Sequence, residues 1–389
     1  MIDRLLELLG ICLRLGTTAF GGPAAHIAMM EAEFVRKRNW LSSEEFVDLI
    51  GASNLVPGPS STEVMLHIGY RRSGILGLIV AGIAFIGPAA ILVCCLASGY
   101  QKFGSLEAFT WAFHGIKPVV VAIVGQAIYL LASKTLNTWP KRSAFGLNLG
   151  ASWFGVAVLP LLFGSGITFG VIESFRERSL KSAKPVANLF VTVFIVAALP
   201  IGVASIYSGP KTAEPISLFL YFLKLGSVIY GSGYVLLAFL EQDIVASLHW
   251  LTKGQLVDAI AIGQFTPGPV FTTATFIGFL KAGVPGALVS TLGIFLPAFL
   301  FVALTGKNIQ TFRKSPIASS FLDGINASAL ALMTVVAIRL GVDALSSIAA
   351  VGIFVVSLAL LLRFKTNSAL LIGVGGILGV VLHQSFHPL

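Results

Sequence analysis

The chain has 389 residues, of which 56% are hydrophobic and only 11% are charged, and its mean hydropathy is +0.90. This composition indicates a membrane protein and excludes an ordinary soluble globular domain. The net charge of +9 at pH 7 does not indicate a nucleic-acid partner. The basic residues instead cluster in short segments between apolar runs, as they do in the cytoplasmic loops of membrane proteins.

Apolar runs long enough to cross about 30 Å of hydrocarbon recur along the chain. The clearest are Ile75–Ser98, Ala112–Ala132, Leu189–Ser208, Val284–Thr305, Ala318–Ile338 and Ser347–Leu362. Shorter candidates are Ala144–Leu159, Leu161–Ile172 and Ala369–Leu382. We expect no cleavable signal peptide, because the first apolar stretch is interrupted by Asp3, Arg4, Glu7 and Arg14. The sequence therefore predicts an all-α polytopic membrane protein.

One long segment occurs twice. Residues 13–62 match residues 223–272 at a constant offset of 210, and 16 of these 50 positions are identical. After one deletion the match continues at an offset of 209, from Gly69/Gly278 to Gly115/Gly324. Each copy contains a Pro-Gly-Pro break. In a strongly apolar chain, two Gly/Pro-interrupted segments in corresponding positions point to the substrate site of a transporter.

The charges of the loops indicate that the two copies have opposite orientations. The basic segments 36–38, 71–72 and 134–142 have a single counterpart in the second copy, whereas basic residues at 307–314 and 363–365 have a single counterpart in the first. By the positive-inside rule, these charges predict that one copy is inverted in the membrane relative to the other. An extra crossing at Leu189–Ser208 supplies the odd number that inversion requires. We therefore expect a first transporter repeat at 1–172, a cytoplasmic basic loop with a linker transmembrane helix at 173–214, and an inverted second repeat at 215–389.

The same rule predicts a cytoplasmic N-terminus and a re-entrant hairpin with the first Pro-Gly-Pro at its tip. Both 36–38 and 71–72 are placed inside, so the segment between them should enter and leave on one side; a full crossing is the alternative. Each copy marks the start of the entering helix with a capping box, Ser42-x-x-Glu45 and Thr252-x-x-Gln255. A tryptophan stands just before each box, Trp40 in the first copy and Trp250 in the second, and both are candidate anchors at the membrane interface.

The Pro-Gly-Pro breaks are the first candidate substrate site. Pro57 must stop the entering helix, and Pro59 suits the first turn of a new one. The N-terminus of such a half-helix offers N–H donors and partial positive charge to an oxyanion. The alternative is a packing kink whose hydroxyls are satisfied. The residues expected to bind are Asn54, Pro57, Gly58, Pro59, Ser60, Ser61 and Thr62, with Gln264, Pro267, Gly268, Pro269 and Thr272 in the second copy.

A second duplicated break lies close to a duplicated cation. The sequence Gly21-Gly22-Pro23 recurs as Gly231-Ser232-Gly233, and seven residues before each break stand Arg14 and Lys224. A cation inside a spanning helix usually faces a cavity and a partner, so these residues are candidates for anion contact; snorkelling to the interface is the alternative. Lys117 is a third, asymmetric candidate, since its counterpart is Asn326.

Coupling to protons requires titratable groups near the breaks, and the nearest are Glu63, His26 and His67. The chain contains no motif for ATP binding, metal-dependent hydrolysis or paired-cysteine redox chemistry, so we expect no cofactor, no metal and no catalytic residue.

Three segments carry a specific resemblance: Phe20–His26, Asn54–Glu63 and Gln264–Pro269 resemble the signatures of the chromate ion transporter (CHR) family in its long, two-domain form. The resemblance covers nearly the whole chain. It implies a bacterial or archaeal inner-membrane protein that exports chromate at the expense of the proton-motive force. It places the family's charged first-helix position on Arg14 and Lys224. The second copy departs from the glycine motif, because Gly231-Ser232-Gly233 lacks the proline, which leaves equal binding by the two halves in question.

The residues alone support an oxyanion carrier surrounded by lipid, and they leave several alternatives open. Sulfate resembles chromate in shape and charge, so a sulfate transporter of the same architecture is one alternative. An intramembrane enzyme using Ser60 or Ser61 with His67 is another, and channel-like conduction is a third. The sequence also leaves a homodimer open.

Overall fold

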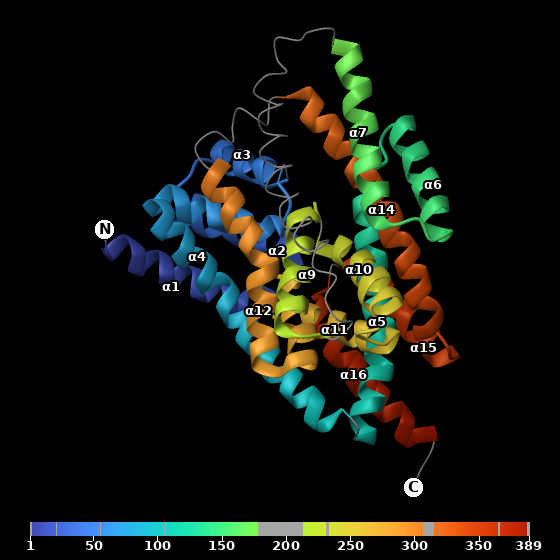
Figure 1. The fold of residues 1–389 in the computed structure, drawn as a ribbon. Helices are drawn as coiled ribbons and strands as arrows, with labels where there is room; N and C mark the ends of the chain where they lie inside the picture. The colour runs from blue at the N-terminus through green and yellow to red at the C-terminus, as the bar shows by residue number, and fades with distance from the viewer. Residues whose placement is uncertain are drawn as a thin grey trace.

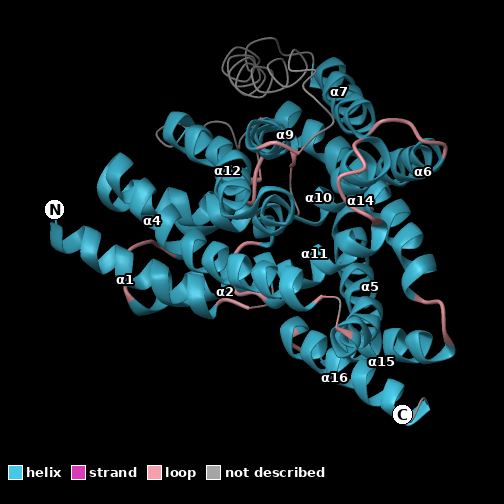
Figure 2. Cartoon of the chain, turned by 60° about the horizontal axis from the view of Figure 1, so that its bottom comes forward, coloured by secondary structure: helices cyan, strands magenta, loops and turns pink. Residues whose placement is uncertain are grey.

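The computed structural model describes residues 2–20, 22–54, 56–104, 106–177, 213–230, 233–305, 315–364 and 366–386. These residues form helices joined by short loops and turns, and no strand occurs among them (Figure 2). Five of the helices described are long and apolar enough to cross a membrane. The prediction of an all-α, multi-pass membrane protein is therefore confirmed.

The first copy folds into seven α-helices and a short π-helical segment within the described ranges. They are α1 (Ile2–Thr18), α2 (Gly22–Met30), the π-helical η1 (Glu31–Lys37), α3 (Ser43–Ser53), α4 (Ser60–Phe103), α5 (Glu107–Thr135), α6 (Trp139–Trp153) and α7 (Val158–Glu177).

The second copy follows the first element by element. Its elements are α9 (Pro215–Val228), η3 (Gly233–Val235), α10 (Leu236–Phe239), the π-helical η4 (Leu240–Ser247), α11 (Lys253–Phe265), η5 (Val270–Thr272), α12 (Thr273–Thr305), α14 (Pro316–Ala344), α15 (Ile348–Phe364) and α16 (Ser368–Phe386). Both ends of α14 lie 209 residues after the ends of α5. The sequence duplication is thus a duplication of secondary structure.

Helix α4 is broken at Ser73 and Gly74, where the backbone leaves the helical region and Gly74 adopts a φ of 62°. Helix α12 is broken in the same way at Ala282 and Gly283. Beyond the break in α4 the chain folds back. A Cβ atom on Gly69 would come within 2.4 Å of the carbonyl oxygen of Gly77, so the two arms touch backbone to backbone. The long arms begin at residues 75 and 284, where the sequence placed the start of two spans.

The segment from α3 to the break in α4 returns to the end from which it started. Arg71, next to the break, forms an ion pair of 3.2 Å with Glu45 in the first turn of α3. The guanidinium of Arg72 lies 4.0 Å from the ring centroid of Trp40. Both predicted capping boxes are present. A hairpin with Pro57–Pro59 at its tip is the resulting shape.

The two copies exchange helices rather than forming separate bodies. Helix α5 packs against α15 and α16 of the second copy, and α14 packs against α6 and α7 of the first (Figure 1). Both contacts rely on glycine. A Cβ on Gly115 of α5 would lie 2.0 Å from the carbonyl oxygen of Gly375 in α16, and one on Gly324 of α14 would lie 2.3 Å from that of Ser165 in α7. Helices α4 and α12 also pack on each other, and the largest cluster of buried hydrophobic residues contains members of both copies.

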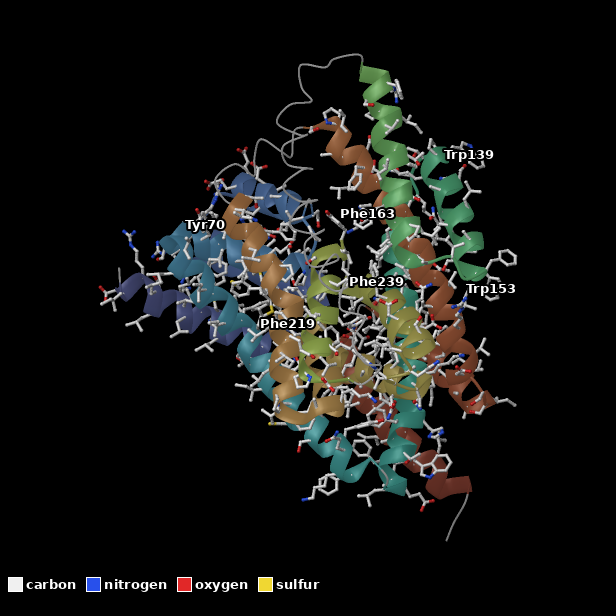
Figure 3. The ribbon with its side chains drawn as sticks, in the orientation of Figure 1. Tyr70, Trp139, Trp153, Phe163, Phe219 and Phe239 are labelled. Atoms are coloured by element: carbon white, nitrogen blue, oxygen red, sulfur yellow. The ribbon has the colours of Figure 1, made fainter. Side chains whose placement is uncertain are left out.

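One predicted span is wrong. Ala144–Leu159 is not a single helix, because α6 ends at Trp153 and the backbone turns at Gly155, which has a φ of 86° that favours glycine. Leu161–Ile172 instead forms part of the longer α7. Exposed Trp139 and Trp153 stand at the two ends of α6 (Figure 3), as in the aromatic belts of membrane proteins. The predicted linker helix at 189–208 lies outside the described residues.

Candidate functional site

Each Pro-Gly-Pro turn forms a backbone hydrogen bond with the opposite copy, and the two bonds involve matching residues. The N–H of Gly58 donates to the carbonyl oxygen of Ile229 at 2.7 Å, and the N–H of Gly268 donates to that of Ala19 at 2.9 Å. Both the donors and the acceptors are 210 residues apart in the sequence. Each turn of one copy therefore docks on the end of the first helix of the other copy, through the same backbone contact in both cases.

Each turn separates two helices, as the prolines predict. Helix α3 ends at Ser53, and α4 begins at Ser60. Pro59 is the N-cap residue of α4 rather than a member of its first turn, and its carbonyl oxygen accepts the N–H groups of Thr62 and Glu63. In the second copy the short 3₁₀ turn η5 stands between Pro269 and α12. Backbone strain is confined to the glycines, since Gly58 has a φ of 142° and Gly268 one of 95°.

A buried histidine connects the first turn to the docking point of the second. His26 is 1% exposed; its Nε2 lies 3.1 Å from the carbonyl oxygen of Ala19, and its Nδ1 lies 3.2 Å from the Ser61 hydroxyl. A carbonyl can only accept, so Nε2 carries the proton and a neutral ring accepts the Ser61 hydroxyl at Nδ1. Ala19 thus receives bonds from both copies. No sequence pattern paired His26 with Ser61.

Several polar groups around these turns are buried and have no hydrogen-bond partner among the described residues. They are Thr62 Oγ1, both carboxyl oxygens of Glu63, His67 Nε2 and Gln264 Nε2. All four side chains are at most 4% exposed. Buried polar atoms are nearly always paired, so these groups are available to hydrogen-bond a polar ligand. The Thr62 hydroxyl and the Gln264 amide nitrogen can both donate hydrogen bonds, as an oxyanion requires.

Both duplicated cations are held by duplicated carboxylates. Arg14 lies 2.5 Å from Glu33, and Lys224 lies 3.7 Å from Asp243. The two carboxylates occupy matching positions 210 residues apart, each within a π-helical segment. Such segments frequently occur at functional sites. Neither Glu33 nor Asp243 was predicted from the sequence, although both copies have an acidic residue at this position.

The remaining candidates fall in three places. Gly22 has a φ of 76° and begins α2, which also contains Pro23, while Gly233 begins η3. Asn54 is an exposed C-cap residue of α3, and Thr272 donates to the carbonyl oxygen of Pro269 at 2.8 Å. Lys117 lies away from the turns, 3.9 Å from buried Asp258, which also accepts the Tyr100 hydroxyl at 2.8 Å. Gly21 and Gly231 lie outside the described residues.

Comparisons with known proteins agree on one family. The family model described as "Chromate transporter" matches residues 6–172 and again residues 216–380. The chain is similar to the chromate transport protein of Cupriavidus metallidurans, with 31% identity over 98% of this chain and 94% of the relative. It is also similar to a probable chromate transport protein of Synechococcus elongatus, with 28% identity over 95% of this chain and 93% of the relative.

The similarity extends to archaea. An uncharacterized transporter of Methanocaldococcus jannaschii is 28% identical over 95% of this chain and 92% of the relative. No solved structure matches the chain. Because the family model covers each copy and the relatives align over nearly their whole length, this chain belongs to the chromate transporter family.

Proposed function

We propose that the protein is a secondary transporter that exports chromate across the inner membrane and draws on the proton-motive force. Family membership supports the substrate, since relatives that align over nearly the whole chain are named chromate transport proteins. The observation that carries the proposal is the pair of Pro-Gly-Pro turns. Each one interrupts a helix in an apolar chain, docks on the opposite copy and is surrounded by buried polar groups, several of them unpartnered.

A single site shared by the two copies fits this geometry. A tetrahedral dianion leaves water only if donors and positive charge replace its hydration. The half-helix that begins at Ser60 contributes its N-terminal dipole, and Thr62 and Gln264 contribute polar groups that lack partners within the described ranges. Arg14 and Lys224 supply positive charge, and their carboxylate partners Glu33 and Asp243 hold them in place.

Alternating access would come from two repeats of opposite orientation, the first at 1–172 and the second at 215–389, joined by a cytoplasmic loop and a linker helix at 173–214. The asymmetry of basic residues between the copies supports inversion and a cytoplasmic N-terminus. The matching pair of hydrogen bonds at Gly58 and Gly268 supports equivalent backbone docking of the two turns as the copies move against each other.

Sulfate is the alternative substrate, because its shape and charge match those of chromate. The enzyme alternative has less support. Ser61 contacts His26 rather than His67, and the other nitrogen of His26 is oriented by a backbone carbonyl instead of a carboxylate. The named relatives are transporters.

The experiment that tests the proposal is radiolabelled chromate flux into inside-out vesicles, with and without an imposed proton-motive force and with excess sulfate. We expect saturable accumulation that requires the proton-motive force and that Ser61→Ala weakens, while the matched change Ser43→Ala at an exposed position of α3 leaves it intact. Movement of sulfate without chromate would keep the architecture and overturn the substrate. Flux that rises linearly with concentration would favour a channel, and complete loss of activity in Ser61→Ala would favour an enzyme.

A further inference from the structure

Glu63 is a titratable side chain that lies directly against a Pro-Gly-Pro turn. It is 0% exposed and stands in the first turn of α4. A Cβ atom on Gly58 would come within 2.4 Å of its Oε1, so the carboxyl group points back at the tip of the hairpin. Neither carboxyl oxygen has a hydrogen-bond partner within the described ranges.

The groups that face Glu63 come from helices α4, α2 and α12 and from the end of α9. None of those nearest to it carries a positive charge that would neutralise a carboxylate. His67 stands one helical turn further along α4, with Arg71 one turn beyond it. Tyr230, at the end of α9, interacts electrostatically with Glu63. His26 of α2 is linked to the neighbouring Ser61, and α12 presents the apolar Ala298 at the tip.

Burial without a partner makes the charged form of a carboxyl group very unfavourable. Within the described residues Glu63 forms no ion pair, unlike Glu33, Asp243 and Asp258, which each contact a lysine or arginine. The arrangement around Glu63 therefore suits a neutral acid. A neutral carboxylic acid also has an O–H group that can donate to an oxyanion, whereas a carboxylate can only accept and would repel it.

The second copy has no equivalent group. At the offset of 210 that relates residues 13–62 to 223–272, Glu63 corresponds to Thr273. The Thr273 hydroxyl donates to the carbonyl oxygen of Val270 at 2.8 Å. Likewise His26 corresponds to Leu236. The two turns share their backbone geometry, but the acidic side chain beside the first turn has no counterpart at the matching position of the second.

We propose that Glu63 binds one proton together with the oxyanion, so that the anion binds only while this carboxyl group is neutral and leaves when it ionises. The inference rests on the proposed function and specifies its coupling. A dianion and a proton then move as a pair with a net charge of −1. The electrical part of the proton-motive force, negative inside, favours export of that pair, whereas a pH gradient that is acidic outside opposes the outward movement of its proton.

The test is equilibrium binding of radiolabelled chromate to the purified full-length protein in detergent, across a pH series from mildly acidic to alkaline. Proton uptake is followed in parallel with an indicator dye, and chromate without protein provides the blank for the anion's own protonation. Linkage requires wild-type affinity to fall about tenfold per pH unit on the alkaline side, with one proton taken up per anion bound there.

Glu63→Gln keeps a neutral donor at this position at every pH. We expect it to bind chromate on the alkaline side more tightly than the wild type, with no pH dependence and no proton uptake by the protein. Glu44→Gln, at an exposed position of α3, is the matched control and should behave like the wild type. Wild-type binding that is independent of pH would overturn the inference, as would a Glu63→Gln protein that follows the wild-type pH profile.

If Glu63→Gln does not yield folded protein, Glu63→Asp carries the test. It withdraws the carboxyl group by one methylene, so we expect proton uptake to persist while the pH midpoint of binding moves. An unchanged midpoint would overturn the inference. Failure of the proposed function gives a different result, namely no chromate binding by the wild type at any pH.

Discussion

Replacing Gly115 by alanine should disrupt the helix exchange between the two copies. The new Cβ would lie 2.0 Å from the carbonyl oxygen of Gly375 and 2.7 Å from the backbone nitrogen of Gly379, whereas real Cβ atoms essentially never come closer than 3.0 Å. Both neighbours are backbone atoms of α16 and cannot rotate away, so α5 and α16 must separate by about 1 Å. Overpacking of this kind costs about 1–3 kcal/mol. Alanine's better helix propensity offsets about 1 kcal/mol of that.

The expected result is a net loss of about 0–2 kcal/mol, read as a lower midpoint of thermal unfolding than that of the control variant, for the purified protein in detergent. Gly125→Ala is the matched control on the same helix. Its Cβ would meet only the Leu358 side chain at an ordinary 3.8 Å, so this variant should be as stable as the wild type or slightly more stable. Equal stability of the two variants would refute the close approach of α5 and α16.

Two further predictions concern charged groups. Lys224→Ala should destabilise the protein by about 1–3 kcal/mol. This is less than the loss of a fully buried ion pair would cost, because the side chain of Asp243 is 25% exposed. Lys224→Arg should restore the thermal midpoint, and an unchanged midpoint in the alanine variant would contradict the pairing. The pKa of Glu45 is lowered from 4.5 by the backbone N–H of Ser42 and then by Arg71, so its stabilisation is present above pH 4.5 and is lost as the pH falls further. Hydrogen exchange protection at the start of α3 should therefore drop below pH 4.5 in the wild type but not in Glu45→Gln, and equal pH profiles would contradict this assignment.

Local features of the fold could be read from the sequence because short-range chemistry determines them. Pro57 and Pro267 end helices wherever the tertiary structure places them, since proline lacks the N–H that a continuing helix needs. The capping boxes at Ser42 and Thr252 form from residues three positions apart. The predicted starts of two long spans coincide with breaks at glycine that the structure confirms.

The relation between the copies could not be read in this way. The exchange of α6 and α7 for α15 and α16 depends on contacts between residues more than 150 positions apart, for which a single sequence carries no pairing signal. The helix break at Gly155 was missed for a different reason. The residues around it are apolar enough to resemble a span, so hydropathy masked the turn.

The candidate site shows the same division. The sequence predicted the turns and the cations near them, and the role of these residues in binding stays a prediction. It did not show that Arg14 and Lys224 meet carboxylates from the π-helical segments, because those partners lie 19 positions further along the chain in each copy. The bonds from Gly58 and Gly268 to the opposite copy are likewise properties of the folded chain alone.

The most direct test of the central claim, one anion site shared by both Pro-Gly-Pro turns, is the stoichiometry of chromate binding measured by equilibrium dialysis on the purified protein. One anion per chain is expected, with an affinity that falls both in Ser61→Ala of the first copy and in Gln264→Ala of the second. Two anions per chain would contradict it. So would a single anion whose affinity changes in one variant and stays at the wild-type value in the other.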